Sequence, residues 1–201
     1  MKLISHRRNT LAELIATPEQ YGIEVDIRSY GDKLVIHHDP FVGGEHFESW
    51  IAQYRHGTLI LNVKEEGLEA RLIDLMKAHG IDDYFFLDQS FPFLVKWSRL
   101  GEHRCAVRVS EFESVETALS LAGKVDWVWV DCFTRFPLDG GDAARLKDAG
   151  FRLCLVSPEL QGRDAALEIP QMIRLLAEQG IVADAVCTKR PDLWEAAVQH
   201  P

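Results

Sequence analysis

The chain has 201 residues, enough for one domain with a sizeable hydrophobic core. Its 22 basic and 31 acidic residues give a formal charge of -9, and because the basic residues are scattered we expect no nucleic-acid partner. The sequence contains neither a signal-peptide core nor a membrane-spanning apolar run, so we expect a cytoplasmic protein without stable membrane association.

Short apolar runs alternate with amphipathic stretches along the chain, which is typical of parallel strands joined by helical crossovers. Glycines at the ends of the amphipathic stretches indicate where the helices stop: Gly80, Gly101, Gly150 and Gly180. Eight runs are predicted as strands: 2–5, 23–28, 59–63, 84–87, 105–109, 127–130, 152–156 and 183–187. Eight such units predict an α/β fold, a single compact (β/α)8 TIM barrel over residues 1–201.

An additional strand is predicted at residues 33–37, after the turn signal Gly31-Asp32. The second barrel strand would then continue into a hairpin, which carries His38 back toward the mouth of the barrel. The four cysteines lie in separate apolar segments without the CxxC spacing of a metal or redox site, so we expect buried, reduced thiols.

Every predicted barrel strand ends in polar residues. In a TIM barrel the chemistry lies at the carboxyl ends of the strands, so eight polar ends that converge on one mouth predict a site. One polar end alone means little, because a strand must leave the core into water. The residues are His6, Arg7, Glu24, Asp26, Lys64, Asp88, Arg108, Asp131, Ser157, Glu159, Thr188 and Lys189.

Two histidines and two carboxylates on the first strands predict a site for proton transfer with a bound cation. Glu24 and Asp26 alternate along a strand and therefore share a face, an arrangement that favours a cation between them. Cleavage of a phosphodiester needs one proton removed and one delivered, and His6 and His38 are suited to both tasks because imidazole titrates near neutrality. Positive groups such as Arg7 would stabilise the charge that develops on the phosphoryl oxygens.

Three motifs resemble those of the glycerophosphodiester phosphodiesterase family, within the barrel phosphodiesterases that include phosphatidylinositol-specific phospholipases C. They are Ser5-His6-Arg7, Gly22-Ile23-Glu24-Val25-Asp26 and Val35-Ile36-His37-His38-Asp39-Pro40. The resemblance implies a role in phospholipid metabolism, with His6 and His38 as general acid and base. It also implies that Glu24 and Asp26 are metal ligands and that Arg7 contacts phosphate.

The sequence departs from the family pattern at three points. Arg8 stands where the family usually has glycine, and the stretch of about twenty residues after His38 is too short for the family's inserted subdomain. Lys64 stands where the family places a third acidic ligand, so we expect a divalent cation, Mg²⁺ or Ca²⁺, to be held weakly. Either Asp88 replaces the missing ligand, or Lys64 itself serves as a fixed positive charge in a metal-free site.

Several candidate residues also have a structural interpretation. Lys64 is a substrate-binding candidate or a surface lysine, and Asp88 is a site residue or a helix N-cap. Arg108, Asp131 and Lys189 would contact the phosphate or headgroup, or form salt bridges at the strand ends. Glu159 and Arg163 would hold a substrate group, or form an ordinary ion-paired loop.

The sequence therefore predicts a hydrolase of small glycerophosphodiester-type molecules, with no prediction of oligomeric state. One alternative is a metal-independent lyase, similar to phospholipase C, in which a substrate hydroxyl attacks phosphorus and leaves a cyclic phosphate. The other is a catalytically silent barrel that binds phospho-ligands. Product analysis distinguishes the hydrolase from the lyase. Binding without turnover would identify the catalytically silent barrel.

Overall fold

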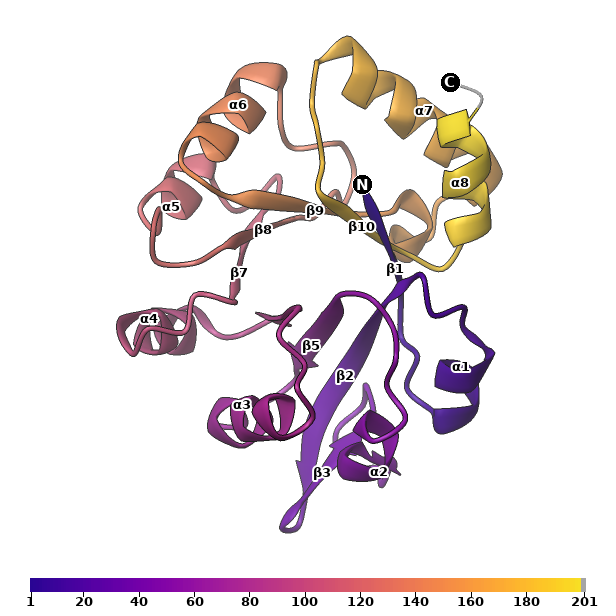
Figure 1. Cartoon of the computed structure of the whole chain (residues 1–201). Helices are drawn as coiled ribbons and strands as arrows, with labels where there is room; N and C mark the ends of the chain where they lie inside the picture. The colour runs from indigo at the N-terminus through magenta and orange to yellow at the C-terminus, as the bar shows by residue number, and fades with distance from the viewer. Residues whose placement is uncertain (200–201) are drawn as a thin grey trace.

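Eight parallel strands form a curled sheet with the helices on its outer side (Figure 1). The computed structural model describes residues 1–199. The strands are β1 (Lys2–Ser5), β2 (Gly22–Tyr30), β3 (Lys33–Ile36), β4 (Glu45–His46), β5 (Leu59–Val63), β6 (Tyr84–Leu87), β7 (Ala106–Val109), β8 (Trp127–Val130), β9 (Arg152–Val156) and β10 (Ala185–Thr188). The parallel strands are β1, β2 and β5 to β10, within two residues of the predicted runs.

The outer layer consists of helices that follow the strands along the chain, with α8 after the last strand. They are α1 (Leu11–Ala16), α2 (Phe47–Ile51), α3 (Glu69–Ala78), α4 (Phe91–Arg99), α5 (Val115–Leu119), α6 (Gly140–Asp148), the 3₁₀ turn η1 (Pro158–Gln161), α7 (Ala165–Glu178) and α8 (Pro191–Gln199). The four glycines predicted to end helices all have positive φ, between 64° and 89°, which confirms that interpretation. No helix within residues 1–199 is long and apolar enough to cross a membrane.

The first and last strands pair with each other, since β1 is hydrogen-bonded to both β2 and β10. On one side the order continues from β2 through β5 to β6, and on the other from β10 through β9 and β8 to β7. Between β6 and β7 the contact is a single bridge, Phe86 to Cys105, with Phe86 N donating to Arg104 O at 2.8 Å. This junction is the weakest part of the sheet.

The predicted hairpin is present, and it extends the sheet beyond the parallel strands. β2 continues to Tyr30 and pairs in antiparallel fashion with β3, which ends one residue before the predicted limit. A short strand, β4, and the helix α2 follow it, and neither was predicted. His37 N donates to Asp26 O at 3.1 Å, so the end of the hairpin is tied to β2 next to the two carboxylates.

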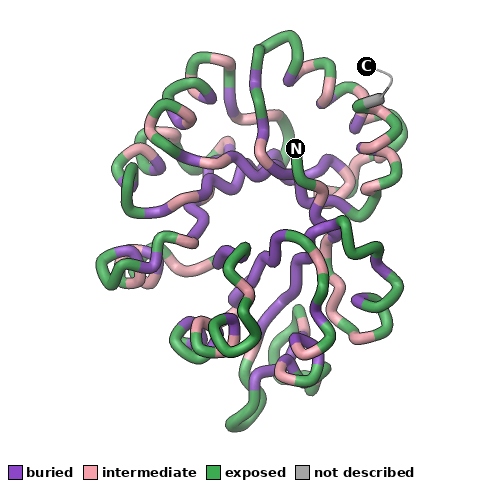
Figure 2. Tube along the Cα trace, in the orientation of Figure 1, coloured by how far each residue is buried: buried purple, intermediate pink, exposed green. Residues whose placement is uncertain are grey.

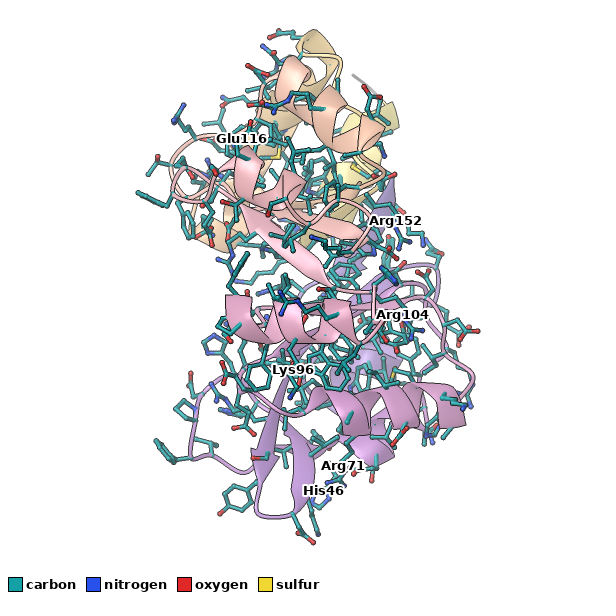
Figure 3. All side chains as sticks on the ribbon, turned by 90° about the vertical axis from the view of Figure 1, so that its left-hand side faces the viewer. His46, Arg71, Lys96, Arg104, Glu116 and Arg152 are labelled. Carbon is teal, nitrogen blue, oxygen red and sulfur yellow. The ribbon has the colours of Figure 1, made fainter. Side chains whose placement is uncertain are left out.

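Buried side chains form two clusters, one inside the curled sheet and one between the sheet and the helices. Figure 2 shows that buried residues are concentrated along the strands. The inner cluster includes Ile4, Phe85, Trp127 and Cys187, one side chain from each of four strands. Arg152 lies over the Trp127 ring at 4.3 Å and closes the end of this cluster where the strands begin. Figure 3 shows Arg152 and Arg104 along one edge of the molecule. All four cysteines are free and buried, as predicted.

Candidate active site

The carboxylates of Glu24 and Asp26 are fully buried in the first half of β2, within the stretch that pairs with β5. Both Glu24 oxygens accept hydrogen bonds, Oε1 from Asn62 Nδ2 at 2.9 Å and Oε2 from Arg7 N at 2.8 Å. His6 Nε2 lies 3.7 Å from Oε2. Because β2 pairs with β5 on one side and with β1 on the other, the carboxyl ends of these two strands lie beside Glu24.

Asp26 is held by three side chains from separate segments. Asn9 Nδ2 donates to Oδ2 at 2.8 Å and Asn9 Oδ1 accepts from Asp26 N at 3.1 Å, so the amide and the aspartate are bonded reciprocally. Arg7 Nε lies 3.4 Å from the same Oδ2. Lys64 Nζ lies 3.3 Å from Oδ1, the one carboxylate oxygen of this pair that has no hydrogen-bond partner in the described part of the chain.

Charges of alternating sign continue from Lys64 across the ends of the next strands. Lys64 Nζ also lies 3.0 Å from Asp88 Oδ2, and the other Asp88 oxygen accepts from Arg108 Nη2. Arg108 Nη1 donates to Asp131 Oδ2 at 3.1 Å, and Gln161 Nε2 donates to Asp131 Oδ1 at 2.7 Å. The structure therefore connects Asp26, Lys64, Asp88, Arg108 and Asp131 in one continuous set of contacts.

The loop after β9 lies against the end of β10. Glu159 accepts hydrogen bonds from Ser157 Oγ, from Thr188 Oγ1 at 2.6 Å and from Lys189 N at 2.8 Å. These contacts hold the loop against the end of β10. Arg163 donates to Cys132 O at 3.1 Å and to Cys132 Sγ at 3.0 Å. These contacts favour the structural interpretation of Arg163 and of Glu159.

His38 lies in the segment that follows β3, and its side chain is 45% exposed. Its Nδ1 pairs with Asp39 Oδ1 at 2.8 Å, and its carbonyl accepts from Arg28 Nε at 3.0 Å and Nη2 at 2.9 Å. His38 and Arg7 line one open depression of about 870 Å³. No hydrogen bond joins His6 to His38 within residues 1–199, but Arg7 is next to His6 in the chain and shares this depression with His38.

Burial and neighbouring charges separate the protonation behaviour of His6 and Glu24. The pKa of His6 is lowered from 6.5 to about 3, first by burial and then by the charges of Arg7 and Lys189. The pKa of Glu24 is raised from 4.5 to about 7, first by burial and then by Asp26. His6 is therefore neutral at neutral pH, and its 3.7 Å contact with Glu24 is not a salt bridge between two charges.

The carboxylates do not fit a divalent cation. Three of the four oxygens of Glu24 and Asp26 already accept hydrogen bonds, and the fourth faces the Lys64 ammonium. A doubly charged ion at about 4 Å from that ammonium would be repelled by about 8 kcal/mol at an effective dielectric constant of 20. Among the described residues, no three His, Cys, Asp or Glu side chains are grouped so as to hold a metal. Ca²⁺ takes six to eight oxygens, which this donor set does not supply.

Two residues of the site have left-handed backbone conformations that are uncommon outside glycine. Arg7 has φ of 50° and Asp88 has φ of 61°. Such conformations cost on the order of 1–3 kcal/mol each, and strained conformations of this kind cluster at active sites and switch regions. At Asp88 this conformation accompanies a carboxylate that contacts both Lys64 and Arg108.

Sequence reasoning missed the amides that hold the carboxylates. Asn62 is on β5, two residues before Lys64, which directly follows the strand, and this alternation is a signal that could have identified it. Asn9 lies in the segment before α1, and nothing in the sequence pattern points to its contact with Asp26. Asp39, which pairs with His38, is within the quoted motif, but no role was assigned to it.

We expect Glu24→Gln to change how stability depends on pH. The folded pKa of about 7 lies above the ordinary 4.5, so folded protein holds a proton here that the unfolded chain has released. The free energy of unfolding contributed by Glu24 therefore falls as pH rises from about 4.5 to about 7. Glutamine does not titrate, so relative to wild type the variant should gain up to about 3 kcal/mol across this window.

Urea unfolding at pH 4.5, 6 and 8 measures this difference. Asn62 Oδ1 is a buried oxygen without a partner in the described structure, so rotation of the Asn62 amide would provide an acceptor for the glutamine NH₂ group. A difference between variant and wild type that stays constant from pH 4.5 to 8 would contradict the raised pKa.

Comparisons with known proteins place the fold among barrel enzymes. No family model matches the sequence, and no curated protein matches it. A glycerophosphodiester phosphodiesterase structure from Agrobacterium tumefaciens has a TM-score of 0.66 at 17% identity, covering 98% of this chain and 99% of its own. A glycerophosphoryl diester phosphodiesterase from Parabacteroides distasonis has a TM-score of 0.67 at 14% identity, covering 98% and 86%.

Structures of the tryptophan synthase α-subunit are similar as well. One from Pyrococcus furiosus has a TM-score of 0.59 at 11% identity, covering 98% of this chain and 94% of its own. The similarities confirm an α/β fold with a curled parallel sheet of the TIM-barrel kind, and at the level of the fold they agree with the resemblance of the motifs. Phosphodiesterases and tryptophan synthase α-subunits share this fold, so the fold alone does not assign an activity. The residues of the site must do so.

Proposed function

We propose that the protein is a phosphodiesterase that acts on small phosphodiesters of the glycerophosphodiester type, with His6 and His38 as its acid and base. The observation that carries the proposal is the group formed by His6, Arg7, Glu24, Asp26 and Lys64, which come from β2 and from the segments that directly follow β1 and β5. The similarity in fold to two phosphodiesterases supports it.

In this proposal His6 removes a proton from the attacking oxygen. The lowered pKa of His6 keeps the imidazole neutral at pH 7, with a free lone pair, but it also makes His6 a weak base. The Glu24 carboxylate, with Oε2 3.7 Å from His6 Nε2, would stabilise the imidazolium that forms. The Glu24 carboxyl, which holds a proton more tightly than an ordinary glutamate, lies next to it and orients Arg7 through the backbone N–H. The nucleophile would be a water molecule for a hydrolase.

His38 delivers a proton to the leaving oxygen. Its Nδ1 is held by Asp39, which lowers the pKa of the Asp39 carboxyl and leaves Nε2 directed away from that contact. The exposure of His38 beside an open depression suits a group that must meet a substrate. Arg7, Lys64, Arg108 and Lys189 would stabilise the charge on the phosphoryl oxygens, since all four project from strand ends on one face.

Product analysis by ³¹P NMR tests the proposal. The wild-type protein, incubated with glycerophosphocholine, glycerophosphoethanolamine and glycerophosphoinositol, should release glycerol phosphate as a phosphomonoester. A cyclic phosphate from the glycerophosphodiester would instead identify the lyase alternative. Saturable binding of these compounds without any product would reject catalysis and identify a phospho-ligand-binding barrel.

A further inference from the structure

We infer that the ammonium of Lys64 takes the place of a divalent cation between the site carboxylates, so that this protein binds no metal there. The inference deepens the proposed function, because it assigns the charge that would assist the reaction to a residue of the chain. The statement that no metal binds concerns only Glu24, Asp26 and Lys64. It can be tested by a binding measurement, without any enzymatic activity.

The position of Lys64 is fixed at both its backbone and its ammonium. Lys64 N donates to Ile27 O at 3.0 Å, and its carbonyl accepts from Arg28 Nη1 at 3.2 Å. The ammonium lies between Asp26 Oδ1, at 3.3 Å, and Asp88 Oδ2, at 3.0 Å, and the side chain is only 15% exposed. A lysine that extended into solvent from a strand end would not be held from two sides.

The free oxygen of the carboxylate pair is the one that faces this ammonium. Asp26 Oδ1 is buried and accepts no hydrogen bond in the described part of the chain, whereas its partner Oδ2 accepts from Asn9. Both Glu24 oxygens accept as well. A metal would have to displace Lys64 both from that oxygen and from Asp88 Oδ2, while the other oxygens of the Glu24 and Asp26 pair already accept hydrogen bonds. The ammonium satisfies the local charge without this rearrangement.

Asp88 acts as a positioning residue in this arrangement. One of its oxygens contacts Lys64 and the other contacts Arg108, so the two cationic groups are held within reach of one small anion. A phosphoryl group carries several oxygens of the kind that Asp88 presents. Lys64 and Arg108 would therefore contact a phosphodiester together, with Asp88 setting their separation.

Isothermal titration with MgCl₂, CaCl₂ and MnCl₂, each alone, tests the metal-binding part. Wild type should show no saturable binding up to millimolar concentrations. Lys64→Glu supplies a third carboxylate beside Glu24 and Asp26, and it should bind at least one of these ions at least tenfold more tightly than wild type. Lys77→Glu makes the same charge change on the exposed end of α3 and should behave as wild type.

Binding by wild type with a dissociation constant below about 100 μM, lost in Asp26→Asn, would overturn the inference. So would a correctly folded Lys64→Glu variant, with the circular dichroism of wild type, that binds no ion more tightly. If Lys64→Glu does not fold, the comparison of wild type with Asp26→Asn still tests whether the wild-type site binds a divalent ion.

Kinetics test the second part, that Lys64 assists the reaction. Activity on the glycerophosphodiester that turns over best should change less than twofold with 5 mM EDTA. Lys64→Met should lower kcat more than 10-fold, and Lys64→Arg should recover part of the loss because it restores the charge. A loss of activity in EDTA that one divalent ion reverses would overturn this part. Absence of turnover on every substrate would count against the proposed function and would leave the metal titration valid.

Discussion

Replacing His6 by glutamine should lower kcat/KM for a glycerophosphodiester by about 10²–10⁴-fold, the range typical of a lost general acid or base. Glutamine keeps a polar group next to Glu24 but exchanges no proton. We expect a large effect because His6 supplies the imidazole of the group around Glu24, with Nε2 3.7 Å from Glu24 Oε2. His79→Gln, at the exposed end of α3, is the matched control and should leave kcat/KM unchanged.

His38→Gln should produce a loss of similar size, because two proton transfers need two groups. Asp39→Asn should have a smaller effect, about tenfold, since it weakens the contact that orients the imidazole without removing the ring. Steady-state kinetics at pH 7 on wild type and the four variants measure these differences. Full activity in either His6→Gln or His38→Gln would reject the assignment of that histidine.

Trp127→Ala should lower the free energy of unfolding by about 3–5 kcal/mol, the usual range for removing a buried tryptophan from a core. The Trp127 ring stacks on Phe85 with ring centroids 4.6 Å apart, and Arg152 lies over it at 4.3 Å. Phe85 is on β6 and Trp127 is on β8, so the stacked pair reaches across β7. It therefore also spans the junction between β6 and β7, where a single bridge joins the strands. The pair therefore holds the sheet together where hydrogen bonding is weakest.

Urea unfolding of wild type, Phe85→Ala, Trp127→Ala and the double variant measures this contribution as a double-mutant cycle. We expect a coupling of about 0.5–1.5 kcal/mol between the two rings. Trp97→Ala on α4, where the ring is only half-buried, should cost clearly less than Trp127→Ala. A loss below about 1 kcal/mol for Trp127→Ala would contradict a packed interior at this junction.

Most of the parallel sheet could be predicted from the sequence, because each barrel strand is a short apolar run bounded by turn residues or glycines. The runs 59–63 and 84–87 coincide with β5 and β6. β4 and α2 were missed because two residues and five residues carry no usable periodicity, and their positions depend on packing against β3. The curling of the sheet could be predicted only from the number of strands, because no single residue or motif indicates it.

The site could be predicted less completely, because its contacts cross between elements. The inward position of Lys64 follows from its spacing after Asn62, and the structure places it against Asp26. The partner of Arg163 could not be predicted, since Cys132 approaches it from a different strand end. Nor could the sequence show that the buried carboxylates already accept hydrogen bonds, the observation that argues against a metal ion.

If His6 and His38 act on the same phosphorus atom, one ligand must contact both imidazoles, and NMR of the two rings measures this. Histidine-labelled protein would be titrated with a non-hydrolysable phosphonate analogue of a glycerophosphodiester, with the resonances assigned through His6→Gln and His38→Gln. We expect the resonances of both imidazoles to shift and to reach saturation at the same analogue concentration. A titration in which one imidazole shifts and the other stays unchanged at saturation would contradict it.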